Sequence, residues 1–381
     1  MRIAMIGIKA IPARFGGFET AVDEISRGLV GLGHHVIVYN RRGMCSHPDR
    51  YYEGVQLITL PTVPSKNFST ICHAFLSTLD VLFRKVDVVH YFTTGASLFA
   101  PLPRLIGKKT VCSVDGTDWQ RAKWGYLARL YLRLSELLAV SFCHGLISDS
   151  KEVMAYYQKV YDTPSSCIPY GTRDYRSDRT DVLERFGLEE RNYVLFVGRL
   201  VPENNVHYLI EAFEQVRTEK KLVIVGDDPW EQEYIRALKA TRDKRIVFTG
   251  GIYGDGYAQL QQNAYIFVLP DEVGGTHPAL VEAMGFGNCV LVNDTPSNLE
   301  VIADCGFSYC GKDGAEDLRD QLRVLVDKPE LVAEYRTRAL FRAQEQYRWQ
   351  DVTRQHAALY ERLLSGGCAV EKPEIARSSG A

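Results

Sequence analysis

The stretch VGGTHPALVEAMGFGNCVLVND (273–294) holds a short glycine loop, a helix-forming segment and an apolar run in succession. PALVEAM predicts a helix with Pro278 in its first turn, and CVLVND (289–294) predicts a buried strand. The apolar run IFVLP (266–270) comes just before the stretch and predicts another strand. Strand, helix and strand in this order are typical of an α/β fold with a parallel sheet.

The glycine loop itself predicts an anion site. Glycines allow a ligand to approach the backbone, and a helix start offers unpaired N–H groups and the positive end of the helix dipole. We therefore expect the N–H groups of Gly275, Thr276 and His277 to hold a phosphate or diphosphate, with Gly274 beside them.

The same alternation runs through the whole chain and predicts two domains. Strand-like runs recur from RIAMIGI (2–8) to GLISDS (145–150), and they restart at YVLFVGR (193–199) after a polar, turn-rich segment at 168–181. We expect two Rossmann-like α/β domains that face each other across a cleft.

The expected domain boundaries follow from these patterns. Residues 1–172 form the first, acceptor-side domain, and residues 173–348 form the second, which binds the donor nucleotide. The amphipathic segment 349–365 is expected to pack back on the first domain, and the small polar residues of 366–381 predict a flexible tail.

Composition narrows the class of ligand. The chain has 381 residues, 46% of them hydrophobic, with a formal net charge of −2, so it has no broad basic field for nucleic acid and a small anionic ligand fits better. Its nine cysteines include no C-x-x-C pair and its histidines show no metal spacing, so we predict no metal and a reducing cytosol. No apolar run is long enough to cross a bilayer and no signal peptide is recognisable, which predicts a cytoplasmic protein.

The segment GIKAIPARFGGFET (7–20) predicts one wall of the cleft. It lacks the G-x-G-x-x-G pattern, which argues against a nicotinamide dehydrogenase. Gly16 and Gly17 can bring backbone N–H groups to a phosphate or sugar, Arg14 adds charge, and Glu19 can accept hydrogen bonds from hydroxyls. The alternative is a glycine turn with Glu19 as a first-turn carboxylate.

Charged residues at strand ends supply the other candidates. Arg199, which follows a buried strand, has a planar fork that suits a diphosphate, although it can instead pair with Glu203 on the surface. Asp115 ends the strand KTVCSV and can orient a hydroxyl or take its proton, although Asp115 and Asp118 also suit a turn and a helix cap. Glu282, one turn into its helix, can accept two ribose hydroxyls, and its alternative is an ordinary solvent-facing glutamate.

Basic and aromatic residues beyond Asp115 suit a membrane surface, although a helix whose apolar side faces the core explains them equally well. They are Trp119, Arg121, Lys123, Trp124, Arg129 and Arg133, and they alternate with Leu127, Leu130, Tyr131 and Leu134.

Together these segments resemble the GT-B glycosyltransferases of the large retaining family 4. YVLFVGRLVPENNVHYLIEAF is similar to the family's Gly-Arg-Leu segment, and VGGTHPALVEAMGFGNCVLVND is similar to its E-x7-E segment. The 7–20 segment and VDGTDWQRAKW resemble more closely the rhamnosyltransferase-like subgroup of bacterial surface polysaccharide synthesis. The resemblance implies a nucleotide sugar donor without a cofactor, and a glycan or lipid-linked acceptor at the inner membrane surface.

Three positions depart from the family pattern. Asn204 replaces a lysine that completes the diphosphate clamp, Gly274 replaces a glutamate that binds the donor sugar, and Asp115 replaces a histidine. A pocket without that carboxylate suits a 6-deoxysugar, so the resemblance implies L-rhamnose from dTDP-L-rhamnose. Arg199 and Asn204 would then lie at the diphosphate, and Asp115, Arg199 and Glu19 would be the catalytic candidates.

Several alternatives stay open at this point. A UDP- or GDP-hexose could replace the rhamnosyl donor, and transfer could proceed with retention or with inversion. A nucleotide-sugar epimerase of the same fold would need no acceptor, and a sugar-binding protein would never turn the donor over.

Overall fold

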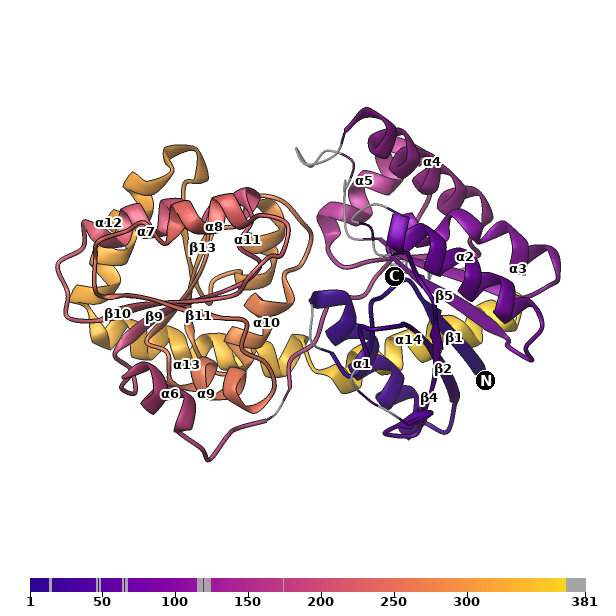
Figure 1. The fold of residues 1–381 in the computed structure, drawn as a ribbon, viewed down its shortest axis with the longest axis horizontal. Helices are drawn as coiled ribbons and strands as arrows, with labels where there is room; N and C mark the ends of the chain where they lie inside the picture. Colours follow the sequence, from indigo (N-terminus) through magenta and orange to yellow (C-terminus); the bar gives the residue numbers. More distant parts are fainter. Residues whose placement is uncertain are drawn as a thin grey trace, which may run out of the picture.

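The computed structural model describes residues 1–13, 16–45, 47, 49–63, 65, 68–114, 119, 125–173 and 175–367. Two α/β domains stand side by side and are joined at the lower edge of the view in Figure 1. The predicted GT-B type of fold, with two Rossmann-like domains, is confirmed. In the part of the chain that the structure describes, no helix is both long and apolar enough to span a bilayer.

The N-terminal domain is built on an eight-stranded sheet in the order β3-β4-β2-β1-β5-β6-β7-β8, in which only the β3–β4 pair is antiparallel. Its strands are β1 (Arg2–Ile6), β2 (His35–Arg41), β3 (Tyr51–Tyr52), β4 (Val55–Leu60), β5 (Val88–Phe92), β6 (Lys109–Val114), β7 (Gly145–Ser148) and β8 (Ser166–Cys167).

Helices cover both faces of this sheet because successive side chains of its strands point to opposite sides. In β1, Ile3 and Met5 share a core with α1 (Gly17–Gly31) and α14 (Trp349–Leu364). Ala4 and Ile6 share the other core with α2 (Phe68–Leu82), α4 (Tyr126–Phe142) and α5 (Lys151–Tyr161). The 3-10 helix η1 (Thr94–Phe99) and α3 (Pro101–Leu105) lie on this second side.

The C-terminal domain has a parallel six-stranded sheet in the order β11-β10-β9-β12-β13-β14. Its strands are β9 (Tyr193–Val197), β10 (Lys221–Val225), β11 (Ile246–Gly250), β12 (Ile266–Leu269), β13 (Cys289–Asn293) and β14 (Phe307–Tyr309). Its helices are α6 (Asp181–Phe186), α7 (Val206–Glu214), α8 (Gln232–Leu238), α9 (Asp255–Asn263), α10 (Pro278–Gly285), α11 (Pro296–Ile302), α12 (Ala315–Asp327) and α13 (Pro329–Gln346), with short 3-10 helices η3 (Pro202–Asn204) and η4 (Gly311–Asp313).

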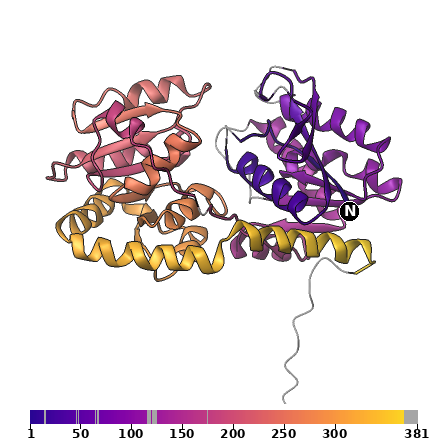
Figure 2. The same cartoon turned by 90° about the horizontal axis from the view of Figure 1, so that it is seen from below.

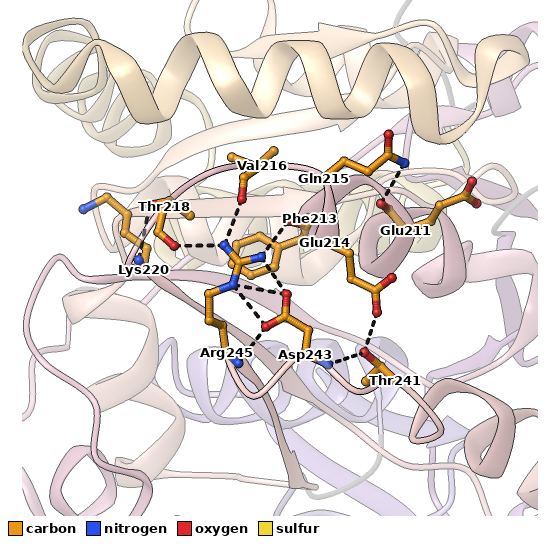
Figure 3. Close-up of polar contacts among 10 residues, drawn as sticks. All are labelled: Glu211, Phe213, Glu214, Gln215, Val216, Thr218, Lys220, Thr241, Asp243 and Arg245. Atoms are coloured by element: carbon orange, nitrogen blue, oxygen red, sulfur yellow. Dashed lines mark hydrogen bonds and ion pairs between the residues drawn. The ribbon is translucent and has the colours of Figure 1, made fainter.

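Arg245, directly before β11, binds the carboxyl end of α7. Arg245 donates to the carbonyl oxygens of Val216 and Thr218 at 2.8 and 2.9 Å, and its guanidinium also binds the Asp243 carboxylate (Figure 3). A cation at the carboxyl end of a helix satisfies carbonyl groups that lack partners within the helix.

The chain crosses between the domains twice, and the two crossings lie together. After α13 the chain re-enters the N-terminal domain as α14, which runs beneath its sheet (Figure 2). At the crossing, the Thr172 N–H donates to the Tyr347 carbonyl oxygen at 2.6 Å, and Thr172 also bridges to Arg348.

Candidate functional site

A cavity of about 280 Å³ lies between the domains at the carboxyl ends of the C-terminal strands. From the N-terminal side it is lined by Ala13, Gly16, Gly17 and Thr20, and from the linker, the segment 168–181 between the domains, by Arg173. From the C-terminal side it is lined by Val197, Gly198, Arg199, Asn204, Val225, Gly226, Asp227, Gly251, Ile252, Tyr253, Gly254, Tyr257, Leu269, Asp271, His277, Pro278, Ala279 and Glu282. Ligands of open α/β sheets bind outside these strand ends.

Glu282 lies at the cavity wall on α10 and is held by a chain of hydrogen bonds. Its Oε2 accepts from the Tyr257 hydroxyl at 2.7 Å, and Gln261 Nε2 donates to the same hydroxyl at 2.9 Å. Asn288 in turn donates to Gln261 Oε1 at 3.0 Å. Glu282 therefore faces the cavity and does not point to open solvent as an ordinary surface glutamate would.

Desolvation raises the pKa of Glu282, while the hydrogen bond from Tyr257 and the nearby positive charge of Arg173 act against that rise. Burial likewise raises the pKa of Tyr257 well above its usual range, so this phenol stays a neutral donor. A carboxylate in such a setting gains strongly from hydroxyl partners.

The glycine loop before α10 lies against the N-terminal domain. A Cβ atom on Gly275 would come 2.1 Å from Asp149 Oδ1, at the end of β7, and the Thr276 hydroxyl donates to the Asp149 carbonyl oxygen at 2.7 Å. Gly274 has φ +141°, a conformation that favours glycine.

Gly274, Gly275 and Thr276 are therefore not among the described residues that line the cavity, whereas His277 is. Gly275 and Thr276 contact the N-terminal domain, and the predicted role of the loop's N–H groups at a diphosphate stays a prediction. The His277 Nδ1 atom lies 3.5 Å from Asp271 Oδ2, and both residues line the cavity.

Arg199 is exposed and lines the cavity, as the diphosphate prediction requires. Within the described residues it forms no ion pair with Glu203, which was the alternative. Asn204 also lines the cavity, and its side-chain amide donates to the Arg199 carbonyl oxygen at 2.9 Å. Asn204 therefore holds the loop that carries Arg199.

The N-terminal wall is formed by Gly16 and Gly17 at the start of α1. A Cβ atom on Gly17 would come 2.7 Å from Pro278 Cγ, so the first residues of α1 and α10 touch. Arg14 and Asp115 lie outside the described residues, so their predicted roles stay predictions.

Glu19 does not line the cavity. Its side chain is 8% exposed, and its Oε1 accepts from the Lys9 N–H at 3.0 Å. This bond holds the loop after β1 against α1. The predicted catalytic role of Glu19 stays a prediction.

Several lining residues were not singled out from the sequence. Arg173, in the linker, forms an ion pair with Glu24 of α1. Asp227 follows β10 and Tyr253 follows β11, both at carboxyl strand ends, and the glycines around them were the available signal. Arg173 had no comparable signal, because only the packing of the linker brings it into the cleft.

No group of three or more histidine, cysteine, aspartate or glutamate side chains gathers in a metal-binding arrangement within the described ranges.

Two family models match the two halves of the chain. Residues 15–173 match Glycosyltransferase Family 4, and residues 178–340 match Glycosyl transferases group 1. The boundary between them falls within the linker.

Individual relatives are more distant. The O-antigen chain mannosyltransferase B of Escherichia coli is 26% identical over 38% of this chain, and the match spans only 36% of that relative. The N-acetylgalactosamine-N,N'-diacetylbacillosaminyl-diphospho-undecaprenol 4-alpha-N-acetylgalactosaminyltransferase of Campylobacter jejuni is 22% identical over 68% of this chain and 72% of its own length.

Solved structures share the architecture. HepE of Anabaena in complex with UDP and glucose superposes with a TM-score of 0.78 at 18% identity, covering 96% of this chain and all of that one. At this identity the likeness establishes the fold alone.

Proposed function

We propose that this chain, a glycosyltransferase with the GT-B fold of group 1 and family 4, transfers L-rhamnose from dTDP-L-rhamnose to a hydroxyl of a lipid-linked or oligosaccharide acceptor. The reaction belongs to bacterial surface polysaccharide synthesis and proceeds with retention. We also propose that the enzyme works at the cytoplasmic face of the membrane, where a lipid-linked acceptor would be presented.

One observation supports the donor site above all: Glu282, backed by Tyr257, shares a single cavity with Arg199. A carboxylate suits vicinal ribose hydroxyls, and a guanidinium fork suits a diphosphate. In this arrangement Glu282 holds the ribose, while Arg199 and the N–H group of His277 face the diphosphate.

The leaving diphosphate gathers negative charge as the glycosidic bond breaks. Preorganised donors stabilise this charge, and the loss of one such donor typically costs about 2.7 to 4 kcal/mol of barrier. Position 204 is an asparagine and not the lysine of the family pattern. Arg199 and the backbone N–H groups at the start of α10 would therefore stabilise the charge of the diphosphate.

The acceptor approaches from the N-terminal wall beside Gly17 and Asp115. With retention, the acceptor hydroxyl attacks from the face that the diphosphate leaves, its oxygen forms the new bond to the sugar, and its proton passes to a diphosphate oxygen. Asp115 then orients the hydroxyl. With inversion, Asp115 would take the proton as a general base.

The choice of donor rests on Gly274, which leaves no carboxylate at a position where the family reads sugar hydroxyls. Proteins similar to this chain carry names that specify mannosyl and N-acetylgalactosaminyl transfer, and one binds UDP, so a UDP- or GDP-hexose is the competing donor.

The decisive experiment is a thermal-shift and calorimetry panel of UDP, dTDP and GDP and their sugars with wild type and Arg199→Ala. A ligand at a hundred times its Kd adds about 2.7 kcal/mol to stability, so the true donor should stand out. Arg199→Ala should lower turnover at least about a hundredfold in a protein that still folds. Turnover within a fewfold of wild type would remove Arg199 from the site.

Product analysis separates the rival reactions. Release of nucleoside diphosphate only with an acceptor present supports transfer, whereas conversion of the nucleotide sugar alone supports an epimerase. Proton NMR of the anomeric centre distinguishes retention from inversion, and loss of the alkaline-rising limb of kcat in Asp115→Asn would indicate a general base. Activity that disappears with chelator and returns with magnesium would contradict metal-independent transfer.

A further inference from the structure

Helix α4 turns its apolar face to solvent. Leu127, Leu130, Leu134 and Leu137 recur at spacings of three and four residues, which places them on one face of the helix. Their side chains are between 47% and 78% exposed.

The opposite face of α4 packs on the domain, where Leu132 and Ala139 are buried beside Ser135 and Glu136. Glu136 accepts a hydrogen bond from the Tyr161 hydroxyl at 2.8 Å. A helix at the surface of a globular protein normally turns polar residues to solvent, whereas α4 turns these four leucines there in addition to the apolar residues that it buries. The core of the N-terminal domain therefore does not account for the leucine face.

The neighbouring helices also carry exposed apolar side chains. Helices α2, α3 and α4 lie on the same side of the N-terminal sheet and contact one another in sequence (Figure 1). We call the exposed apolar side chains of this layer the apolar patch. It consists of Phe68, Phe75, Phe83, Leu105, Ile106, Tyr126, Leu127, Leu130, Leu134 and Leu137.

The exposed charges of the same layer are mainly positive. They include Lys85, Arg104, Arg129 and Arg133. Arg133 stacks over the Trp119 ring with its Cζ 4.1 Å from the ring centroid, so this indole lies beside α4.

The acidic residues of this layer do not offset that charge. Asp80 is paired with Arg84 and Glu136 is buried, which leaves Asp87 as an exposed carboxylate against these four cations. A large exposed apolar surface bordered by cations marks an interaction site, and an anionic lipid bilayer complements both properties.

We propose that the apolar patch on α2, α3 and α4 docks the enzyme on an anionic membrane surface, with the leucines of α4 inserted among the lipids. The inference rests on the proposed function in one respect: it supplies the surface from which a lipid-linked acceptor would enter.

The test is co-sedimentation of the full chain with vesicles of phosphatidylethanolamine and phosphatidylglycerol, compared with vesicles of phosphatidylcholine alone. The variant Leu127→Ser/Leu130→Ser/Leu134→Ser should bind the anionic vesicles at least about tenfold more weakly. The three changed positions are exposed, and thermal unfolding checks that the variant folds. Arg129→Glu should weaken binding to anionic vesicles without changing the small residual binding to phosphatidylcholine.

Phe341→Ser on α13 is the matched control, because Phe341 is 62% exposed but belongs to the C-terminal domain. It should bind vesicles like wild type. Equal vesicle binding by the triple-leucine variant and wild type would overturn the proposal, as would no binding by wild type. A wild-type dimer that the leucine changes convert to a monomer, without vesicle binding, would assign the patch to a second copy of this chain instead.

The sugar-transfer proposal and the membrane-docking proposal can each be contradicted without affecting the other. Vesicle binding requires no nucleotide sugar, so membrane docking can succeed with every donor inactive. Conversely, the triple-leucine variant should transfer sugar to a water-soluble acceptor at the wild-type rate, because its changes lie outside the cavity.

Discussion

Among the candidate site residues, Glu282 has the surroundings that packing alone explains least well. Its neighbours Asn288, Gln261 and Tyr257 form a hydrogen-bonded row that ends on its carboxylate. Such a row costs side-chain entropy and buries polar groups, so it is best explained by the need to hold the carboxylate in one position.

Glu282→Gln should separate stability from binding. Because the pKa of Glu282 is raised in the folded protein, its contribution to stability falls as pH rises from the unfolded pKa towards the folded one. Glutamine removes this dependence and can still accept from Tyr257, so the variant should be at least as stable as wild type at neutral pH. Thermal unfolding across pH measures this.

The same Glu282→Gln change should weaken donor binding, although it does not lower stability. A hydrogen bond to a charged group contributes about 1.5 to 3 kcal/mol, so Glu282→Gln should weaken nucleoside diphosphate binding by about tenfold or more. Calorimetric titration measures this loss. A variant that is less stable but binds normally would contradict the assignment of Glu282 to the ribose.

Arg173 and Glu24 should shift the pH dependence of donor binding in opposite directions. Arg173 lowers the pKa of Glu282, whereas Glu24 raises it. Arg173→Gln should therefore move the acidic limb of nucleoside diphosphate binding to higher pH, and Glu24→Gln should move it to lower pH. If both variants instead moved the acidic limb equally and in the same direction, the Arg173–Glu24 ion pair, and not the separate charges, would set the pH dependence.

At the scale of elements, Arg245 shows how one side chain joins a helix to a strand. Its bonds to the end of α7 and to Asp243 are partly shielded from solvent, with side-chain exposures of 27% and 16% for the ion pair. The hydrogen bond from Arg245 lowers the pKa of Asp243, so this stabilisation is present above the unfolded pKa and is lost as pH falls through the folded one.

Arg245→Met should lower the free energy of unfolding by about 1 to 3 kcal/mol, because it leaves carbonyl groups of the α7 end without their donor. Urea unfolding at neutral pH measures this, and the loss should shrink at acidic pH. Arg338→Met is the control, because its ion pair with Glu334 is half exposed and should contribute little. An equal loss in both variants would show that capping of α7 is unimportant.

The elements themselves could be predicted from local patterns. The alternation of apolar runs and helical segments fixes two parallel sheets because each strand must be buried on both faces. The glycine loop before α10 was a harder case. Glycine permits close approach of any group, and here the group beside Gly275 is Asp149 of the other domain, a contact that no local pattern contains.

Some site residues could likewise be predicted from the sequence, and others could not. Arg199 and Glu282 could be found because each stands at a fixed step after a recognisable strand or loop. The bond that Glu19 accepts from the Lys9 N–H could not be predicted, because a helical pattern gives the position of Glu19 but not the direction in which its side chain points. Arg173 enters the cavity only because the linker folds between α1 and α10, which depends on how the domains meet.

At the scale of the whole molecule, the domains meet through a few contacts on both sides of the cleft. The Lys151 N–H donates to Glu300 Oε2 at 2.8 Å, and the Ser297 hydroxyl donates to Glu152 Oε2 at 2.6 Å. Together with the Thr276 bond to the end of β7, these place the donor and acceptor walls at a defined distance. Transfer requires that distance to be correct, because the acceptor and the donor are held by different domains.

Gly17→Ala tests this dependence where α1 meets α10. The new Cβ would lie 2.7 Å from Pro278 Cγ, so the domains must move apart slightly. A misplacement of about 1 Å can lower a rate about a hundredfold, and kcat should therefore fall by at least about tenfold while binding of nucleoside diphosphate to the C-terminal domain changes little. Gly31→Ala is the matched control, because it ends the same helix and its Cβ would meet nothing within 4 Å. If Gly17→Ala turned over like Gly31→Ala, close contact between these two helix starts would not be needed for catalysis, and the acceptor would have to reach the donor without this approach of the domains.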